Sequence, residues 1–512
     1  MSVVHEHLNE SAETTDHELD RVLDAAVAAA SAWEDQTPTQ RARVLVALAD
    51  ALSAHVDSLV AVAGEETGLP EARLRGEVSR TSVQLRMFAE ELLAGRFLDV
   101  VIDLPDPQFV LGPRPDLRRY QVPVGPVLVF AASNFPFAFS VAGTDTASAL
   151  AAGCPVILKA HPGHPQTSAM TADIVTAALA AAGAPAGIFA MITGVDAGVR
   201  ALQDPRVAAA AFTGSVPGGR TLFDIASARK CPIPFYGELG SLNPAVITSG
   251  AAAERTEDIA AGFVGSFTLG AGQFCTKPGL LLVPHGSALV ARSAELAAEV
   301  PAARMLTAKI AQGFRSRLDD VRRVDGVDVL VDGAEVPAGE DGVPSFSPTL
   351  LRTNATALLE HAEVLLEETF GPTAIVVEYA SVAEVHEILS RLDGALTVTV
   401  HTPANPDAAE RQELRGLIRV AAARTGRVVF NGWPTGVAVT PAQNHGGPYP
   451  ATTAIAHTSV GTSAMNRFLR PIAYQDAPTE LLPEQLQDAN PMGVPRRTHE
   501  AGQSQSWGQA AF

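Results

Sequence analysis

Two residues in small-residue surroundings, Cys275 and Glu238, carry the most specific chemistry in the sequence. Cys275 follows a Leu-Gly-Ala-Gly run at 269–272, which lets the backbone approach a ligand closely, and it precedes a Pro-Gly turn. A thiol reacts as the thiolate, so a neighbour must lower its pKa or a base must take its proton. The pair therefore indicates covalent catalysis, followed by attack of a water that Glu238 activates. Taken alone, Cys275 is better explained as a buried structural cysteine.

Gly214, Ser215 and Lys159 are typical of nucleotide binding at the ends of parallel strands. Gly214 and Ser215 lie between a predicted strand at 208–212 and a predicted helix, whose N-terminus favours a pyrophosphate. Lys159 follows another predicted strand and points toward the crevice where ligands bind in such sheets. Each feature also fits an ordinary alternative, a βα turn or a solvated lysine, because the spacing is not G-x-G-x-x-G.

Alternating strands and helices position these residues. Residues 17–98 have helical periodicity, residues 103–120 are rich in Pro, Arg and Asp, and βα units follow from about residue 122. These units predict a mostly parallel sheet covered on both faces, with a second α/β block over 243–430. Strands are expected at 127–131, 155–158, 188–192, 208–212, 279–283, 373–377 and 467–474, and helices at 144–152, 167–182, 196–202 and 218–227.

The composition excludes several classes of protein. The chain has 512 residues, too many for one hydrophobic core, and no apolar run approaches the ~20 residues that span a bilayer. Its formal net charge of -19 disfavours a nucleic-acid partner, because phosphate binding needs clustered Lys and Arg. The three cysteines form neither a disulfide framework nor a zinc motif, and the N-terminus is acidic, unlike a secretory signal. We expect a cytoplasmic protein with no metal site and no membrane contact.

Six short motifs occur in one order along the chain and resemble those of the aldehyde dehydrogenase superfamily. They are ASNFP at 132–136, LKAHP at 158–162, FTGS at 212–215, GELG at 237–240, GQFC at 272–275 and EETFGP at 367–372. Any one of them can arise by chance, but six in this order are specific, and the resemblance covers about residues 20–495. The segments at 134–140, 159–165, 273–279 and 445–450 are similar to those of the subgroup of 2-oxoglutarate semialdehyde (2,5-dioxopentanoate) dehydrogenases, which are relatives of NADP-preferring bacterial fatty aldehyde dehydrogenases.

The resemblance implies an aldehyde dehydrogenase-like α/β fold in three parts. A Rossmann-type cofactor-binding domain is expected over 1–106 and 124–241, and an α/β catalytic domain over 242–465. A small β oligomerisation arm, which pairs between subunits in this family, is expected over 107–123 and 466–490. We therefore expect a homodimer or a homotetramer. The polar residues 496–512 are predicted to form a disordered tail.

The resemblance also implies a mechanism. Cys275 attacks the aldehyde to give a thiohemiacetal, and the Asn134 side-chain amide with the Cys275 N–H forms an oxyanion hole. Hydride transfer to the nicotinamide leaves a thioester, and Glu238 acts as general base on the hydrolytic water. A purely structural role for Glu238 stays the alternative.

The remaining residues of the resemblance concern the cofactor, NADP or NAD. Lys159 is expected at the ribose hydroxyls, Gly214 and Ser215 with Gly219 at the pyrophosphate, and Glu368 with Phe370 at the nicotinamide ribose and ring.

The residue three positions after Lys159 indicates which cofactor is preferred. NAD-preferring members often carry a glutamate there, which accepts from both adenosine ribose hydroxyls, whereas this chain has Pro162. No carboxylate at that position repels a 2′-phosphate, and Arg200 in a nearby helix can pair with one. The sequence therefore favours NADP over NAD, although Arg200 fits a surface residue equally well.

Several readings of the substrate and the enzyme class stay open. The expected substrate is 2,5-dioxopentanoate, and the alternative is a medium- or long-chain fatty aldehyde. A 2-oxo acid needs a cation or amide donors at the far end of its tunnel, and the sequence does not say which side chain that is. A cofactor-independent cysteine esterase is an alternative of a different class, but it leaves Lys159 and Gly214-Ser215 without a purpose. A relative that has lost catalysis is disfavoured because Cys275 and Glu238 are both present.

Aromatic and histidine side chains are weaker candidates. Five aromatic residues can line an apolar tunnel or simply belong to the core: Phe135, Phe139, Phe274, Trp433 and Tyr449. The histidines in Pro- and Gly-rich segments are expected in turns or packing: His161, His164 and His445.

Overall fold

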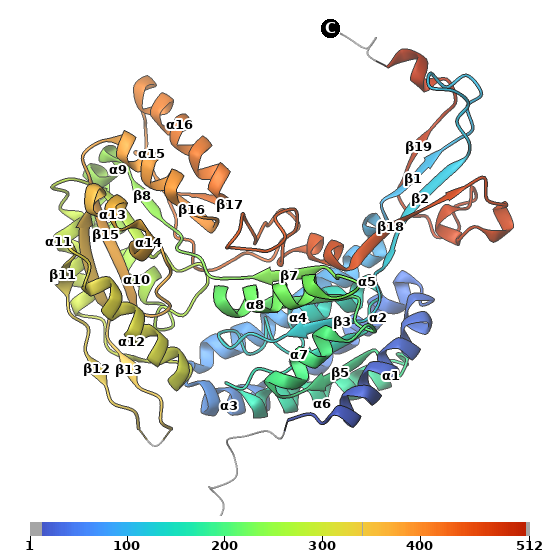
Figure 1. Cartoon of the computed structure of the whole chain (residues 1–512), viewed down its shortest axis with the longest axis horizontal. Helices are drawn as coiled ribbons and strands as arrows, with labels where there is room; N and C mark the ends of the chain where they lie inside the picture. The colour runs from blue at the N-terminus through green and yellow to red at the C-terminus, as the bar shows by residue number, and fades with distance from the viewer. Residues whose placement is uncertain (1–12, 340, 508–512) are drawn as a thin grey trace, which may run out of the picture.

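The computed structural model describes residues 13–339 and 341–507, which form two α/β domains and a β arm (Figure 1). The predicted α/β fold class is confirmed. The N-terminal domain and the second domain lie side by side, and the arm extends away from both of them.

The first domain is built on a five-stranded, all-parallel sheet of order β5-β4-β3-β6-β7. Its strands are β3 (Val127–Phe130), β4 (Val156–Lys159), β5 (Phe189–Ile192), β6 (Ala209–Thr213) and β7 (Phe235–Glu238). Its crossover helices are α5 (Thr144–Ala152), α6 (Pro165–Ala181), α7 (Val195–Gln203) and α8 (Val216–Ala228). The strand order reverses between β3 and β6, and ligands bind in such sheets at the carboxyl ends beside this reversal.

Four N-terminal helices complete this domain: α1 (Asp16–Glu34), α2 (Pro38–Ala54), α3 (Val56–Thr67) and α4 (Glu71–Ala94), with the short η1 (Arg96–Leu98). Capping boxes at Thr15 and Thr37 satisfy the first N–H groups of α1 and α2. The helices bury one large core with the sheet, and Trp33 donates to the Leu150 carbonyl at 3.1 Å. Within the described residues no single helix is long and apolar enough to cross a membrane, and α2 with α3 reaches that length only across a 67° bend.

The second domain contains a seven-stranded sheet of order β11-β14-β15-β9-β8-β16-β17, in which only the edge strand β11 is antiparallel. Its strands are β8 (Ala245–Ile247), β9 (Leu280–Pro284), β11 (Asp328–Val331), β14 (Thr349–Asn354), β15 (Thr373–Tyr379), β16 (Ala395–His401) and β17 (Thr425–Phe430). A small separate sheet holds β10 (Ala303–Arg304), β12 (Glu335–Val336) and β13 (Ser345–Phe346).

Helices cover both faces of the seven-stranded sheet, and each face packs its own hydrophobic cluster. The helices are α9 (Ser249–Glu254), α10 (Thr256–Thr268), α11 (Leu289–Ala298), α12 (Ala308–Arg322), α13 (Ala355–Glu360), α14 (Ala362–Leu365), α15 (Val382–Arg391) and α16 (Ala408–Arg424). The central strands are buried on both sides, which explains their nearly continuous apolar sequences.

After β17 the chain returns to the first domain through residues 431–468. Backbone hydrogen bonds join this returning segment to β7, from Leu239 to the Ala451 carbonyl (2.9 Å) and from Thr453 to the Gly237 carbonyl (3.1 Å). The segment ends in the 3-10 helix η2 (Thr462–Phe468), which packs against α5. It therefore bridges the two domains.

The arm is a four-stranded sheet of order β18-β2-β1-β19. Its strands are β1 (Val100–Asp103), β2 (Leu117–Pro123), β18 (Leu469–Gln475) and β19 (Arg496–His499), and short 3-10 turns η3 (Thr479–Leu481) and η4 (Glu484–Leu486) follow β18. Strand β1 belongs to this sheet although the boundary drawn from sequence at residue 107 placed it in the cofactor domain.

The prediction of a disordered tail over 496–512 is wrong for the described part, residues 496–507. Strand β19 pairs in parallel with β1, and the 3-10 helix η5 (Gln503–Ser506) follows. Trp507 packs edge-on against Phe109, with ring centroids 5.5 Å apart, and His499 pairs with Asp103 at 2.6 Å. The segment is too polar to build a core of its own, but the open edge of β1 supplies its partners. Residues 508–512 lie outside the described residues.

Candidate active site

The predicted site residues converge where the carboxyl ends of the first sheet meet the second domain. Asn134 follows β3, Lys159 ends β4 and Glu238 ends β7, while Gly214 and Ser215 follow β6. Cys275 comes from the loop between α10 and β9 of the second domain. The thiol and the carboxylate are thus contributed by different domains.

An unusual backbone run places the cysteine loop. Gly270, Ala271 and Gly272 have φ values of +57°, +54° and +67° in succession, so even the alanine adopts a left-handed conformation. A Cβ atom on Gly272 would lie 2.1 Å from the Gly371 carbonyl oxygen, so only glycine permits this approach. The loop is thereby held directly against the 368–371 segment.

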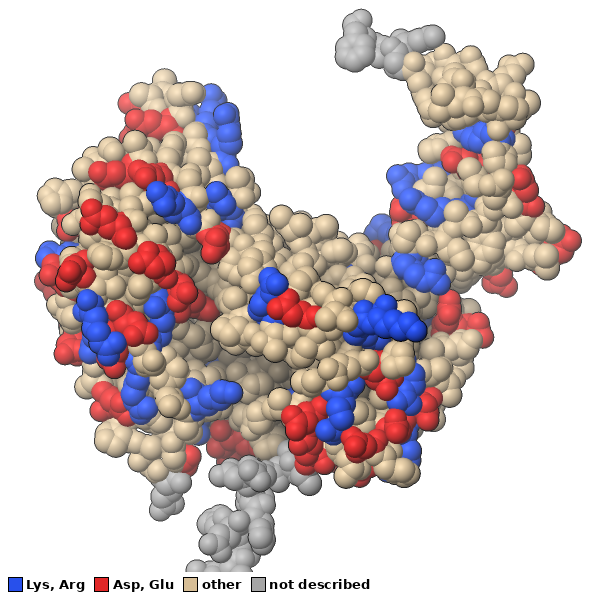
Figure 2. Space-filling view, in the orientation of Figure 1, with Lys and Arg blue, Asp and Glu red and all other residues tan. Residues whose placement is uncertain are grey.

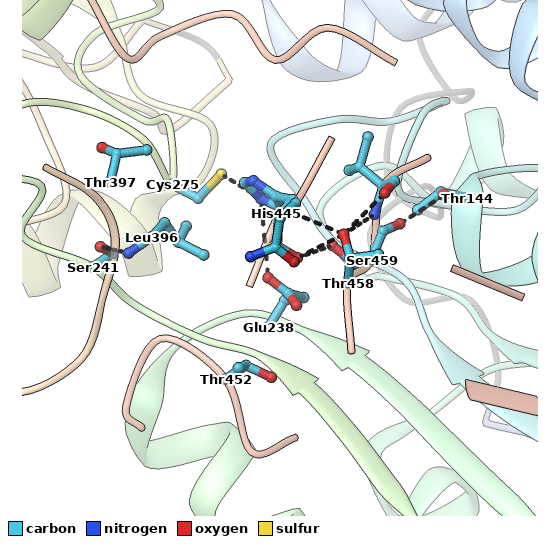
Figure 3. Close-up of polar contacts among 12 residues, drawn as sticks. Thr144, Glu238, Ser241, Cys275, Leu396, Thr397, His445, Thr452, Thr458 and Ser459 are labelled. Carbon is cyan, nitrogen blue, oxygen red and sulfur yellow. Dashed lines mark hydrogen bonds and ion pairs between the residues drawn. The ribbon is translucent and has the colours of Figure 1, made fainter. Parts of the chain in front are cut away.

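Cys275, His445 and Glu238 form a contiguous polar row (Figure 3). The Cys275 Sγ lies 3.7 Å from His445 Nε2, which lies 4.0 Å from Glu238 Oε2. His445 and Glu238 are buried, and within the described chain Glu238 Oε2 has no hydrogen-bond partner. The sequence analysis expected a turn or packing role for His445. Its neighbours in sequence do not show the contact, since the returning segment brings His445 to a thiol that lies 170 positions away.

Burial dominates the protonation of this row. Burial, with the Glu238 and Glu368 carboxylates, raises the pKa of Cys275 to about 12. Burial likewise raises the pKa of Glu238 well above its ordinary value. Burial, together with the Arg427 and Arg80 cations, lowers the pKa of His445 to about 3. At neutral pH the site therefore holds a protonated thiol beside a neutral imidazole.

Asn134 lies against the cysteine loop. Its Nδ2 donates to the Gln273 carbonyl at 3.1 Å, and its own backbone carbonyl accepts from Arg73 at 2.6 Å. The amide is buried, and the residue that it bonds, Gln273, lies two positions before Cys275. Its position is compatible with donation to an oxygen at the reacting carbon.

Aromatic rings and two arginines pack together near the thiol. Phe135 contacts Phe139 and Phe274 edge-to-face, with centroids 5.4 and 5.3 Å apart. The Arg73 guanidinium carbon lies 4.7 Å from the Phe274 centroid, and that of Arg80 lies 5.4 Å from the Phe139 centroid. Two other aromatic candidates lie elsewhere: Trp433 packs on Phe263 and His401, and Tyr449 is exposed.

Arg80 is a cation near the thiol whose hydrogen bonding is incomplete, although the Glu77 carboxylate acts on its charge. Its Nε and Nη2 atoms are buried and make no hydrogen bond within the described part of the chain. Glu77, one turn earlier on α4, accepts instead from the N–H groups of Phe137 (2.8 Å) and Ala138 (3.0 Å). The charge of Arg80 acts on both Cys275 and His445. The sequence pattern of the helix that becomes α4 does not distinguish Arg80 from a solvent-exposed arginine.

Arg427 is a second cation near the reacting row. It lies on β17, is half-buried, and donates from Nη2 to the Pro434 carbonyl at 2.8 Å. Its charge lowers the pKa of His445 more than that of Arg80 does. Arg80 and Arg427 therefore make this end of the site electropositive.

Lys277 positions the segment that carries Glu368 and Phe370. The buried Lys277 Nζ donates to the Thr369 and Thr373 carbonyls at 2.7 and 2.8 Å. Burial raises the pKa of Glu368 to about 7, an effect that Lys277 opposes. Glu368 Oε1 is buried without a hydrogen-bond partner among the described residues, so it can accept from a hydroxyl group.

The turn after β6 leaves a helix N-terminus open. Ser215 caps α8 by accepting from the Gly218 N–H at 3.3 Å, and Gly214 donates to the Glu238 carbonyl at 3.0 Å. A Cβ on Gly219 would lie 2.1 Å from Leu239 Cδ2, so glycine lets α8 pack closely on the end of β7. Gly214 and Ser215 are exposed, as pyrophosphate contacts require.

Lys159 and Arg200 both lie near the first turns of α7, but they contact different parts of the chain. The Lys159 chain packs against Gly198, where an added Cβ would be 3.1 Å from Lys159 Cγ. Arg200 pairs with Asp16 at 2.8 Å and donates to the Thr14 carbonyl at 3.1 Å. Arg200 is thus engaged by the N-terminal segment.

Comparison with known proteins agrees with this arrangement. A model described as the aldehyde dehydrogenase family matches residues 3–457. The "Alpha-ketoglutaric semialdehyde dehydrogenase 2" of Azospirillum brasilense is 44% identical over 486 residues, which cover 94% of this chain and 90% of that protein. The "Alpha-ketoglutaric semialdehyde dehydrogenase" of Acinetobacter baylyi is 39% identical over 482 residues, with the same 94% and 90% coverage.

The fold is also similar to solved structures. The gamma-glutamyl-gamma-aminobutyraldehyde dehydrogenase of Burkholderia cenocepacia J2315 superposes with a TM-score of 0.77 at 22% identity, covering 91% of this chain and 90% of that one.

Proposed function

Because this chain belongs to the aldehyde dehydrogenase family, we propose that it oxidises 2-oxoglutarate semialdehyde (2,5-dioxopentanoate) to 2-oxoglutarate with NAD or NADP. The two most similar relatives reported above carry the name of this activity, and they match nearly the whole chain. The family membership gives the reaction type, NAD(P)-dependent oxidation of an aldehyde. The choice of substrate depends on one further feature of the site.

That feature is the unpartnered guanidinium of Arg80. Arg80 is half-buried over Phe139, its Nε and Nη2 atoms are buried, and its charge acts on Cys275. A buried donor without a partner costs about 1–3 kcal/mol, and a carboxylate can satisfy two guanidinium donors at once. A 2-oxo acid aldehyde brings such a carboxylate into the tunnel, whereas an alkyl aldehyde leaves Arg80 unsatisfied. Phe135 and Phe139 suit the short methylene chain in between.

The reaction then follows from the row of Cys275, His445 and Glu238. The thiol must lose its proton to attack, and the neutral His445 imidazole lies next to it. A substrate carboxylate near Arg80 offsets a positive charge that holds down the pKa of His445, so substrate binding makes this imidazole a better base. The Asn134 amide and the Cys275 N–H stabilise the alkoxide of the thiohemiacetal.

The second half of the reaction uses Glu238. A nicotinamide held by Glu368 and Phe370 would supply the hydride acceptor, and Cys275 would then carry a thioester. Burial raises the pKa of Glu238, which brings this carboxyl closer to the range in which a general base works at neutral pH. Glu238 takes the proton of the water that hydrolyses the thioester and releases the carboxylate product.

The residues present fit a dinucleotide. Glu368 Oε1, buried without a partner in the described chain, can accept from ribose hydroxyls, and Phe370 on the same segment can contact the nicotinamide ring. The open turn of Gly214 and Ser215, with Gly219 behind it, suits the pyrophosphate, and Lys159 suits the adenosine ribose. The sequence predicted a preference for NADP from Pro162 and from Arg200. Arg200 no longer supports it, because this arginine is paired with Asp16, so only Pro162 remains as support.

We also propose a homodimer or homotetramer assembled through the arm. Figure 2 shows a broad hollow between the arm and the second domain, and β18 lies at an open edge of the arm sheet. An exposed strand edge of this kind normally needs a covering partner. Light scattering on the purified chain tests the assembly. The cytoplasmic location stays a prediction from the sequence.

The test of the substrate compares 2,5-dioxopentanoate with hexanal and decanal in the wild type, Arg80→Met and Arg86→Met. Arg86 lies on the same helix but is exposed and paired with Asp50, so it is the matched control. We expect the oxo acid to be preferred, and R80M to lower its kcat/KM roughly 30- to 100-fold while changing hexanal less than about 3-fold.

Other outcomes contradict the proposal in different ways. Preference for decanal, or equal losses for both substrates in R80M, would keep the dehydrogenase and overturn its substrate. Ester hydrolysis without reduction of either cofactor would favour the cysteine esterase.

A further inference from the structure

The segment that precedes α1 crosses the ends of β5 and α7. Thr14 donates from its N–H to the Thr193 carbonyl at 3.1 Å, and its Oγ1 accepts from the Thr193 N–H at 2.9 Å. The next residue toward the N-terminus, Glu13, accepts through Oε1 from the Ala197 N–H at 2.8 Å. A carboxylate from the N-terminal segment therefore occupies the first turn of α7.

The backbone of α7 is shaped for this side chain. Gly194, directly before the helix, has φ +97°, and a Cβ there would lie 2.2 Å from Glu13 Cγ. A residue with a side chain at this position would displace Glu13. Arg200, one turn further along, holds the same segment through Asp16 and the Thr14 carbonyl. The position of Glu13 is thus fixed from both sides.

Lys159 lies at the same turn. Its side chain packs against Gly198, the residue after the one that donates to Glu13. Burial lowers the pKa of Lys159, and the charge of Glu13 opposes that effect while Lys309 adds to it. Glu13 is therefore the carboxylate that acts on the lysine expected at the adenosine ribose.

We propose that Glu13 supplies, from the N-terminal segment, the carboxylate that Pro162 leaves absent beside Lys159, and that it makes the enzyme prefer NAD to NADP. The inference rests on the proposed function, since it needs a dinucleotide whose adenosine ribose lies at Lys159. A carboxylate there accepts from ribose hydroxyls. A 2′-phosphate carries a charge of about -2 and meets both the repulsion of Glu13 and a helix N–H that is already bonded.

This assignment changes the role of Arg200. From the sequence, Arg200 was a partner for a 2′-phosphate, and that was a reason to favour NADP. In the structure Arg200 forms an ion pair with Asp16 and donates from Nη2 to the Thr14 carbonyl, so it helps to hold the segment that carries Glu13. The same arginine thus supports discrimination against the phosphate.

The experiment measures binding without turnover. Isothermal titration of the full-length protein with ADP-ribose and with 2′-phospho-ADP-ribose gives a ratio of dissociation constants. We expect the wild type to bind ADP-ribose at least ~10-fold more tightly, and Glu13→Gln to reduce that ratio at least ~5-fold, chiefly by tightening the phosphorylated ligand. Glu13→Lys should reverse the ratio. Glu65→Gln, an exposed carboxylate on α3, should leave it unchanged.

The possible results distinguish the proposed function from the proposed role of Glu13. A wild type that binds neither compound would overturn the dinucleotide itself, and with it the proposed function. A wild type that prefers the phosphorylated ligand, or a ratio that stays the same in Glu13→Gln and Glu13→Lys, would overturn the role of Glu13 and leave the dehydrogenase intact. Thermal unfolding of each variant confirms that a changed ratio does not come from a damaged fold.

Discussion

The proposed aldehyde end and the proposed adenosine end of the site differ in how their arginines are bonded. At the proposed aldehyde end, Arg80 is half-buried on aromatic rings, and its buried Nε and Nη2 make no hydrogen bond in the described chain. At the proposed adenosine end, Arg200 is partly exposed, forms an ion pair with Asp16 and donates from Nη2 to the Thr14 carbonyl. An unsatisfied buried cation has binding energy to offer an anion, whereas a paired surface cation has little. The comparison teaches that an arginine near a ligand indicates an anion site only when its donors are free.

The strongest test of the proposed aldehyde end removes the proposed nucleophile. Cys275→Ala should lower kcat/KM at least ~10⁴-fold, because no other group in the row can form the thiohemiacetal. The affinity for ADP-ribose should change less than about 2-fold, since the adenosine end lies in the other domain. Stopped-flow absorbance of the reduced cofactor and calorimetry give the two values.

The control for this variant is Cys231→Ala, which changes an exposed cysteine. It should keep wild-type activity. Oxidation that survives in C275A would contradict the covalent mechanism, and a parallel loss of ADP-ribose binding would show that the two ends are not independent.

His445 makes a smaller, pH-dependent contribution. Its folded pKa of about 3 lies below the ordinary 6.5, so between these values the unfolded chain binds a proton that the folded chain does not. The free energy of unfolding therefore rises with pH through that window. Above about pH 6.5 the contribution of His445 changes little. Between pH 6.5 and 5, the wild type should lose about 2 kcal/mol more stability than His445→Gln.

Urea unfolding of both proteins at the two pH values measures this difference. His161, whose pKa burial also lowers to about 3, is common to both proteins and cancels. Equal pH dependence in the two proteins would mean that His445 accepts its proton in the folded state without penalty.

The smallest effect is expected at the adenosine end. Arg200→Met removes a partly exposed ion pair worth about 0.2–1 kcal/mol, so it should loosen the N-terminal segment slightly. The preference for ADP-ribose over its 2′-phosphorylated form should fall about 2- to 3-fold, and kcat/KM for the aldehyde should not change measurably. A loss of affinity for the phosphorylated ligand would instead restore Arg200 as a phosphate partner.

The sequence predicted those parts of the site whose signals are local. Cys275 and Glu238 each stand in a short run of small residues, and Lys159 ends a strand whose apolar residues are contiguous. The confirmed α/β class followed from the same periodicity. These features depend on neighbours within a few positions, so one chain is enough to recognise them.

The parts that were missed depend on distant contacts. His445 reaches the thiol only because the returning segment crosses between the domains, and Glu13 reaches Ala197 across 184 positions. Strand β19 is polar throughout and gains its order from the edge of β1. From local composition such segments are predicted to be turns or disordered tails, because the residues that they contact lie far away in the sequence.

The raised pKa of Cys275 also bears on how the enzyme withstands oxidants. Peroxides and alkylating reagents attack the thiolate, so a thiol with a pKa of about 12 is nearly inert to them at neutral pH. The exposed Cys231 reacts with such reagents first, and its modification should not affect catalysis. Burial therefore protects the Cys275 sulfur from such reagents until a base takes its proton, as the proposed mechanism requires.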